Sequence, residues 1–297
     1  MEKKVITRRD FLKVASMTPL AGAFLPGLLT GQDTERPNKS KVVLIRDKNV
    51  LDPGGKQNPE IIQRMLDDAV TALLGEKDPV NAWKTLVKST DTVGIKTNVW
   101  NYLPTGAAIE QALKRRVMDA GVADARISID DRGVLRNPIF KEATALINAR
   151  PARSHHWSGM GGCIKNYIMF VPSPSDYHGD ACADLAKIWD LPLVKNKTRL
   201  NVLVMLTPLF HGIGPHHFSK EYTWPYGGLI VGKDPVAVDT VGVQILQAQR
   251  QRYFGEEKPM QTSPHHITLA ATRHHLGHTS PEHIELIRLG WQEDLLI

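Results

Sequence analysis

The chain has 297 residues, of which 42% are hydrophobic and 23% charged. This composition is typical of a soluble globular protein with one large domain or two small ones. The formal net charge is +6, but residues 1–30 alone carry five Lys or Arg against two acids, and the remainder has no basic run, so nothing here supports nucleic-acid binding.

Residues 1–30 are interpreted as a signal segment. Residues 7–13 (TRRDFLK) resemble the twin-arginine export signal, and the apolar stretch 14–29 contains Gly and Pro and is short for a membrane span. We therefore expect a periplasmic or otherwise extracytoplasmic protein, delivered by the twin-arginine export machinery. It would touch a membrane only through an uncleaved signal segment. The alternative is a basic, amphipathic start to the folded domain.

After a polar linker at residues 31–40, strand and helix patterns alternate along the chain. Asn58 before Pro59, and Asp234 before Pro235, are typical helix starts. In chain order, the pattern predicts a strand over 41–47, helices over 59–74 and 80–87, a strand over 92–98, a helix over 107–120, a strand over 125–131, a helical or partly extended segment over 138–148, helices over 163–170 and 181–189, strands over 199–206 and 227–232, and helices over 234–252 and 269–276. This alternation predicts an α/β fold with a mostly parallel sheet and helices on both faces, in one lobe or two.

Polar residues follow two of the predicted strands. Lys96 and Asn98 lie at the end of one strand, and Asp130 and Asp131 lie at the end of the next. Ligands of open α/β sheets bind outside the carboxyl ends of the strands, so we expect functional side chains there.

A glycine-rich bend lies before the predicted helix at 163–170. Gly159, Gly161 and Gly162 allow the backbone to approach a ligand closely, and free N–H groups at the helix start favour an anion. Lys165 lies in the first turn, where partial burial would lower its pKa and make it nucleophilic. The alternative is a tight strand-to-helix turn with Lys165 reaching solvent.

The histidines and cysteines bear on metal binding. All twelve histidines follow residue 154, eight of them in adjacent pairs, and neutral imidazoles bind zinc, copper or nickel. No HExxH motif is present. Two cysteines, Cys163 and Cys182, cannot hold a four-cysteine iron–sulfur cluster, so none is expected. They are either paired in a disulfide or present as two buried thiols.

Asp239 lies within an apolar run of the helix that starts at Asp234. A buried carboxylate must be paired, hydrogen-bonded or bound to a cation. Lys96 or Lys165 is a possible partner, and a structural buried pair is the alternative to a role in a site.

Three segments, together with the later His178, resemble the family called domain of unknown function 362. They are VGIKTN at residues 93–98, RSHHWSGMGGCIKN at 153–166 and GGLIVGKDPVAVDTVG at 227–242, with Thr97 and Arg153 replacing the family's usual proline and lysine. The resemblance implies one α/β domain over residues 41–297. A more remote resemblance, to the nickel-pincer lactate racemases, implies a transition metal or a metal-bearing nucleotide, with Lys165 as its attachment point and His178 as a metal ligand.

These observations predict a polar pocket for a small molecule. Its members are His155, His156 and Lys165 as catalytic residues, Lys96, Asn98, Gly159, Gly161, Gly162, Lys165, Asn166 and Asp239 as cofactor-binding residues, and His178 as the metal ligand. We expect a racemase or isomerase that acts on a small carboxylate-bearing substrate, with histidines as acid and base near neutral pH. The alternative is a non-catalytic metal- or ligand-binding protein of the cell envelope.

Overall fold

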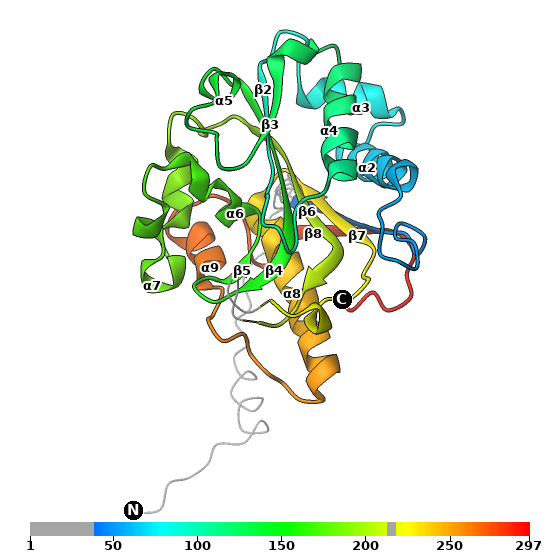
Figure 1. Ribbon diagram of the computed structural model, residues 1–297, viewed down its shortest axis with the longest axis vertical. Helices are drawn as coiled ribbons and strands as arrows, with labels where there is room; N and C mark the ends of the chain where they lie inside the picture. The colour runs from blue at the N-terminus through cyan, green and yellow to red at the C-terminus, as the bar shows by residue number, and fades with distance from the viewer. Residues whose placement is uncertain (1–38, 213–217) are drawn as a thin grey trace, which may run out of the picture. The chain divides into compact units, whose positions relative to one another are not determined.

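The computed structural model describes residues 39–212 and 218–297 (Figure 1). The predicted signal segment and most of the predicted linker lie outside the described residues, so the export motif stays a prediction. Contacts divide the chain into residues 1–36 and 37–297, and every described residue belongs to the second of these units.

An open, mostly parallel sheet forms the centre of this unit, as the sequence predicts. The strand order is β3–β2–β4–β6–β7–β1–β8, with β5 added as a hairpin partner of β4. Neighbours from β3 to β6 are parallel, and β7 is antiparallel to both β6 and β1. The strands are β1 Ser40–Arg46, β2 Val93–Lys96, β3 Ile127–Asp130, β4 Ala145–His155, β5 Gly159–Gly161, β6 Thr198–Leu209, β7 Gly228–Gly232 and β8 Ile284–Gly290.

Helices cover both faces of the sheet (Figure 1). The longer ones are α2 Pro59–Leu74, α3 Pro79–Leu86, α4 Ala107–Asp119, α8 Pro235–Phe254 and α9 His265–Thr272, and single turns are α5 Pro138–Lys141, α6 Cys163–Asn166 and α7 Gly179–Cys182. Short 3₁₀ turns lie at Asp124–Arg126, Tyr167–Phe170, Pro174–Tyr177, Leu185–Asp190, Lys220–Tyr222 and Pro281–His283. None of the helices in residues 39–212 and 218–297 combines the length and hydropathy of a membrane-spanning segment.

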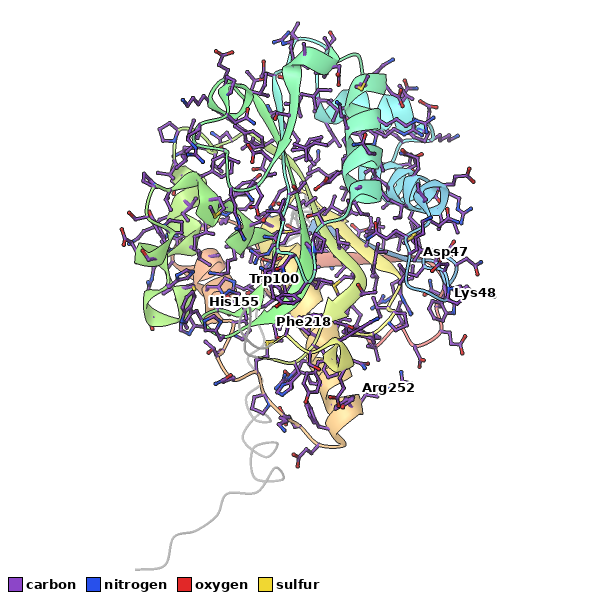
Figure 2. The ribbon with its side chains drawn as sticks, in the orientation of Figure 1. Asp47, Lys48, Trp100, His155, Phe218 and Arg252 are labelled. Atoms are coloured by element: carbon purple, nitrogen blue, oxygen red, sulfur yellow. The ribbon has the colours of Figure 1, made fainter. Side chains whose placement is uncertain are left out.

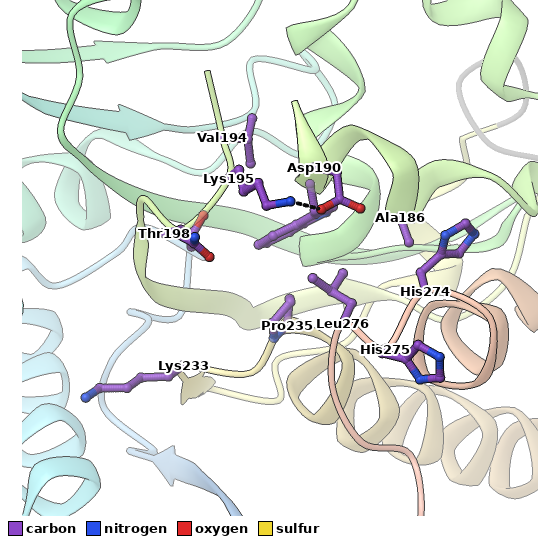
Figure 3. Close-up of a pocket in the computed structure, with 12 residues that line it drawn as sticks. Ala186, Asp190, Val194, Lys195, Thr198, Lys233, Pro235, His274, His275 and Leu276 are labelled. Atoms are coloured by element: carbon purple, nitrogen blue, oxygen red, sulfur yellow. Dashed lines mark ion pairs between the residues drawn. The ribbon is translucent and has the colours of Figure 1, made fainter. Parts of the chain in front are cut away.

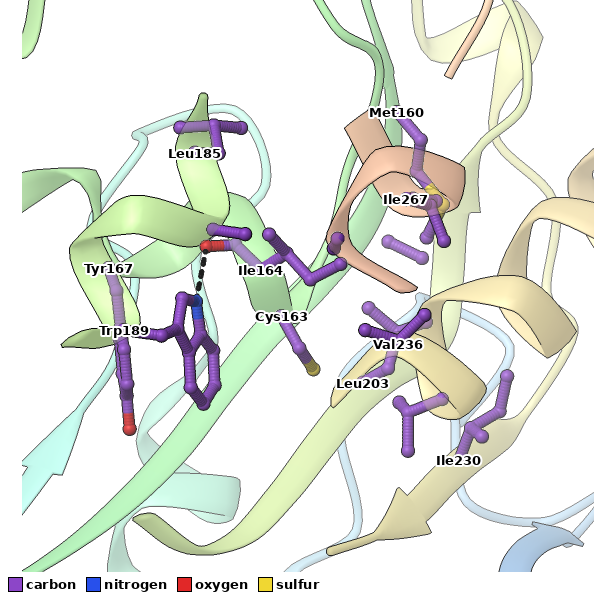
Figure 4. Packing of buried hydrophobic residues seen from close by; sticks show 14 of the residues in the cluster. Met160, Cys163, Ile164, Tyr167, Leu185, Trp189, Leu203, Ile230, Val236 and Ile267 are labelled. Carbon is purple, nitrogen blue, oxygen red and sulfur yellow. Dashed lines mark hydrogen bonds between the residues drawn. The ribbon is translucent and has the colours of Figure 1, made fainter. Parts of the chain in front are cut away.

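The two faces of the sheet hold separate hydrophobic clusters because successive strand side chains point to opposite sides. On β1, Val43 packs with α2, α3 and α4, whereas Val42 and Leu44 pack with α6, α8 and α9. Figure 4 shows part of the cluster that contains Val42 and Leu44, where the Trp189 indole N–H donates to the Ile164 carbonyl at 3.3 Å. This contact fixes the 3₁₀ turn Leu185–Asp190 against α6.

Side-chain caps set the helix starts that the sequence predicts. The Asn58 side chain accepts from two backbone N–H groups of α2. Asp234 Oδ1 does the same at α8, and Asp234 Oδ2 accepts from the Ser40 hydroxyl at 2.7 Å and from the His278 N–H at 2.9 Å. Asp234 therefore joins β1, α8 and the chain after α9.

Three strands were not predicted. The 11-residue β4 is buried throughout but contains Arg150, Pro151 and Arg153, which interrupt an apolar pattern. The other two are the three-residue β5 and β8. The predicted helix over 181–189 was wrong at its start, because Asp180, Ala181 and Cys182 have φ of 46°, 49° and 66°.

Candidate functional site

A cavity of about 230 Å³ lies at the carboxyl ends of β2, β3 and β4, where the sequence places its candidate residues. Figure 2 labels Trp100, after β2, and His155, the last residue of β4, at this edge. Its walls consist of Asn98, Trp100, Asp131, Arg132, Arg150, Arg153, His155, Trp157, Lys165, Asn166, Ile168, Met169, Pro174 and His178. Five of the predicted site residues therefore share one cavity, namely Asn98, His155, Lys165, Asn166 and His178.

Two buried arginines of β4 face this cavity. Residues three positions apart on a regular strand point to opposite faces, but the pairing of β4 with β6 shifts register between Pro151 and Arg153. Arg150 and Arg153 are only 3% and 7% exposed. Arg153 donates to Asn98 Oδ1 at 3.2 Å and lies on the Trp100 ring, with 4.1 Å from its guanidinium carbon to the ring centroid.

Neither arginine has an acidic partner in contact. Among the described residues, the Arg150 side chain makes no hydrogen bond, and the Nε atoms of Arg150 and Arg153 are buried without an acceptor. Burial lowers the pKa of both guanidinium groups. Buried charges are normally paired. An anion bound in the cavity would supply the charged partner that these two guanidinium groups lack.

Lys96 forms a buried ion pair behind the cavity wall. Its amine lies 2.5 Å from Asp131 Oδ1 and 2.7 Å from the Thr97 carbonyl oxygen, and Asp131 Oδ2 accepts from the Val99 N–H at 3.0 Å. Burial lowers the pKa of Lys96 to about 8, although Asp131 opposes the effect. Asp131 is therefore the partner of Lys96, and Asp239 is not.

Lys165, from α6, is 3% exposed and reaches the cavity. Burial lowers its pKa to about 8, and the Cys182 thiol, 3.6 Å away, opposes this. Cys182 and Cys163 are both free and buried, so they are not joined in a disulfide. An amine with a pKa near 8 is available as a base close to neutral pH.

The neighbouring asparagine ties α6 to the sheet. The Asn166 amide group donates to Asn148 Oδ1 at 2.8 Å and to the carbonyls of Lys96 and Ala149, and Asn148 in turn donates to Asn201 Oδ1 at 2.8 Å. This buried chain of amides fixes the position of α6 and therefore of Lys165. Asn166 has a positioning role in addition to lining the cavity.

The histidines of the site are neutral. Burial and the nearby cations lower the pKa of His155 far below its usual value. Its Nδ1 accepts from the Trp157 N–H at 3.2 Å, so Nε2 carries the proton. The His178 ring packs against the Trp157 ring at 4.2 Å between centroids, with the planes tilted by 37°, and burial lowers the pKa of His178 to about 4. His156 stacks on His155 at 5.0 Å but does not line the cavity.

The glycine bend packs against the protein itself. A side chain at Gly162 would collide with the Asp239 carboxylate, and one at Gly161 would lie 2.7 Å from a terminal nitrogen of Arg150. Gly159 has φ of 70°, and a side chain there would strike the Thr262 carbonyl. These glycines leave room for buried charged groups and neighbouring backbone.

Asp239 accepts from the N–H groups of Cys163 at 2.7 Å and Ile164 at 2.9 Å. The predicted anion at the start of this helix is therefore the protein's own carboxylate. Desolvation raises the pKa of Asp239 to about 6, although the two backbone hydrogen bonds oppose this. Neither Lys96 nor Lys165 is its partner, contrary to the sequence-based expectation, and its contacts are those of a helix cap.

The sequence did not identify Arg150, Arg153 or Cys182 as site residues. If residues 145–155 are recognised as a buried strand, Arg150 and Arg153 become candidate site residues, because arginine is rarely fully buried without a partner. Nothing in the local sequence indicates the turn that brings Cys182 to Lys165.

The described residues do not fit a metal-bearing nucleotide. In residues 39–212 and 218–297, no three His, Cys, Asp or Glu side chains lie close enough to hold a metal ion. The cavity is also smaller than the roughly 300–1,000 Å³ of sites for drug-sized ligands. The described residues therefore give no support to the metal site predicted at His178.

A second cavity, of about 330 Å³, lies at the opposite edge of the sheet (Figure 3). His274 and His275 point in different directions there, and Lys195 pairs with Asp190 at 3.1 Å. This cavity contains none of the predicted residues and has no convergent set of functional groups.

Comparison with known proteins gave one match. The family model described as Domain of unknown function (DUF362) matches residues 132–244. That range includes β4, the glycine bend, Lys165 and Asp239, and it supports the resemblance to this family stated above. No curated protein and no solved structure matches the chain.

Proposed function

We propose that this chain, related over residues 132–244 to a family of unknown function, is an exported enzyme of the racemase or isomerase type. Its substrate would be a small molecule with a carboxylate, bound in the cavity at the end of β4. The observation that carries this proposal is one cavity with a basic amine, Lys165, beside two buried arginines that lack acidic partners.

The reaction would be a proton exchange at the carbon next to the carboxylate. Neutral Lys165 removes that proton, and the C–H electron pair moves into the carboxylate to form an enediolate. The ammonium group of Lys165 then returns a proton, exchanged with solvent, to the same carbon. Return to the original face restores the substrate, and return to the opposite face, after the planar enediolate has turned over in the cavity, gives its mirror image. Arg150 and Arg153 stabilise the added negative charge, because fixed charges act strongly in a site that excludes water.

The neutral histidines would orient the substrate. His155 carries its proton on Nε2 and can donate a hydrogen bond to a carboxylate or hydroxyl oxygen. Trp157 packs on His178, and both side chains line the cavity. We assign proton transfer to Lys165 and hydrogen-bond donation to His155.

Solvent deuterium exchange tests this proposal. The whole chain would be incubated in D₂O with L-lactate, L-malate, L-alanine or L-aspartate, and loss of the α-proton signal would be followed by NMR. We expect exchange with at least one acid, faster as the pH rises toward 8, because Lys165 is neutral above its pKa of about 8. Lys165→Ala should slow it about 100-fold or more.

The control variant is Lys187→Ala, which removes an exposed lysine paired with Asp184. It should exchange at the wild-type rate. Absence of exchange with every acid would contradict the enzymatic proposal. If one of these acids nevertheless bound to the protein without exchange, that result would favour the alternative function, a non-catalytic ligand-binding protein of the cell envelope.

Export is proposed from the sequence alone. Arg8→Lys with Arg9→Lys, made in the full chain, should retain the protein in the cytoplasm of a host with a twin-arginine pathway. Cell fractionation measures this, and unchanged export of the double variant would remove the localisation proposal.

A further inference from the structure

The charges around the cavity narrow the class of ligand, on the premise that the proposed function is right. We propose that the cavity binds a small ligand with two negative charges, held between Arg150 and Arg153.

The first support is the absence of acidic partners for the two guanidinium groups. Arg150 and Arg153 are more than nine-tenths buried, both line the cavity, and both have an Nε without an acceptor among the described residues. Each also repels the other, and this repulsion is the main electrostatic effect on Arg153 after burial itself. An anion placed between them would relieve both costs.

The second support is the balance of charge. Lys96 and Asp131 offset each other as an ion pair at 2.5 Å. The other buried charges nearby are Arg150, Arg153 and Lys165 against one carboxylate, Asp239, whose oxygens already accept two backbone hydrogen bonds. At pH 7 Lys165 is mostly protonated, so these buried groups have two unmatched positive charges, and the exposed Arg132 adds a third to the wall.

The third support is the size of the cavity and the apolar part of its wall. About 230 Å³ is enough for a molecule such as a four-carbon dicarboxylate, and too little for a drug-sized ligand. The remaining wall offers Trp100, Trp157 and Ile168 to a short carbon skeleton. A compact ligand with anionic groups close together fits a wall that combines two arginines with apolar side chains.

Two matched pairs of probes test the charge of the ligand. Isothermal titration calorimetry on the whole chain at pH 7 and low salt would compare succinate with monomethyl succinate, and sulfate with methanesulfonate. Within each pair the size is similar and the charge differs by one. We expect the dianion of at least one pair to bind about tenfold or more tightly than its monoanion. The pair that responds distinguishes a dicarboxylate from a single divalent group.

Equal affinity within both pairs, or no binding of any of the four probes, would overturn the inference. Equal affinity would still leave the proposed binding of a carboxylate in place. If the wild-type protein showed no deuterium exchange but still bound dianions more tightly than monoanions, the proposed function would be wrong and this inference would stand.

Variants locate the site. Arg153→Gln and Arg150→Gln should remove most of the preference for the dianion, whereas Lys195→Gln, in the second cavity, should retain it. Preference retained in both folded arginine variants would place the dianion elsewhere and overturn the inference. Since Arg150→Gln removes a buried side chain, circular dichroism must first show that it is folded. If neither arginine variant folds, the comparison of dianion and monoanion binding to the wild-type protein still tests the inference.

Discussion

The contact between the Lys165 amine and the Cys182 thiol depends on unusual backbone geometry. Asp180, Ala181 and Cys182 adopt three consecutive left-handed conformations, each of which costs roughly 1–2 kcal/mol for a residue with a side chain. The turn brings Cys182 Sγ to 3.6 Å from Lys165 Nζ. Since burial lowers the pKa of Lys165 and the thiol raises it, Cys182 adjusts the pH at which the amine becomes a base.

Cys182→Ala should therefore lower the pKa of Lys165 further, by roughly half to one pH unit, because the amine loses its hydrogen-bonded neighbour but keeps its burial. Reductive methylation of Lys165 across a pH series, quantified by peptide mass spectrometry, reports this pKa without any substrate. Cys163→Ala removes the other buried thiol and should leave the curve unchanged. If the pH dependence of Lys165 methylation is the same in Cys182→Ala as in the wild type, the thiol has no influence on the pKa of Lys165.

The sequence located five of the fourteen residues of the cavity wall but assigned some roles incorrectly. Lys165, His155 and His178 lie on either side of one glycine-rich segment, so their convergence could be predicted from short-range spacing. The pairing of Lys96 with Asp131 rather than Asp239 could not, because it depends on how β2 and β3 lie beside each other. Long-range pairing of charges is set by tertiary packing, which local patterns do not encode.

At the scale of the secondary-structure elements, α6 is a single turn held in place by Asp239 from α8. Removal of the carboxylate would leave the N–H groups of Cys163 and Ile164 buried without acceptors. Asp239→Ala should lower the free energy of unfolding by about 2–4 kcal/mol, measured by urea denaturation. A loss below about 0.5 kcal/mol would contradict the capping role.

Gly162 provides a double-mutant cycle for the same contact. Its backbone has φ of −127°, which alanine tolerates, so Gly162→Ala should destabilise only by collision with the Asp239 carboxylate. The cost should fall by at least about 1 kcal/mol when Asp239 is already alanine. Additive costs in the double variant would show that the two residues do not interact.

Elements with strong local signals were predicted and the others were missed for identifiable reasons. α2 and α8 have both a side-chain cap and proline in the first turn. β4 has the opposite character, since Arg150, Pro151 and Arg153 interrupt its apolar run. The same arginines that concealed the strand give the cavity its charge, so the failure of the pattern coincided with the candidate site.

For the whole molecule, buried neutral histidines predict sensitivity to acid. Burial lowers the pKa of His178 to about 4 and of His266 to about 3, and lowers that of His155 further. The pKa values of these histidines are lower in the folded state than in the unfolded chain. Their contribution to stability is therefore complete above about pH 6.5. It is lost as the pH falls through the folded-state pKa values, because the unfolded chain then binds more protons. Asp239, with its raised pKa, acts in the opposite direction.

We therefore expect the melting temperature to fall steadily between pH 7 and pH 4.5, measured by differential scanning calorimetry. His266→Leu should make this dependence shallower, because His266 is fully buried and its ring nitrogens lack partners meeting hydrogen-bond geometry. Ile267→Val, at the next position of α9, should lower stability without changing the slope. An unchanged slope in His266→Leu would exclude His266 as a contributor.

Each aspartate of the segment that opens α8 fills the space beside a glycine distant in the chain. Gly162 faces Asp239, and Gly277 faces Asp234 closely enough that any side chain would collide. If either partner mutates during evolution, the restriction on the other is lifted. Homologous sequences should therefore keep or lose these glycines and aspartates as couples, and such correlated changes would reveal distant kin whose short signatures have diverged.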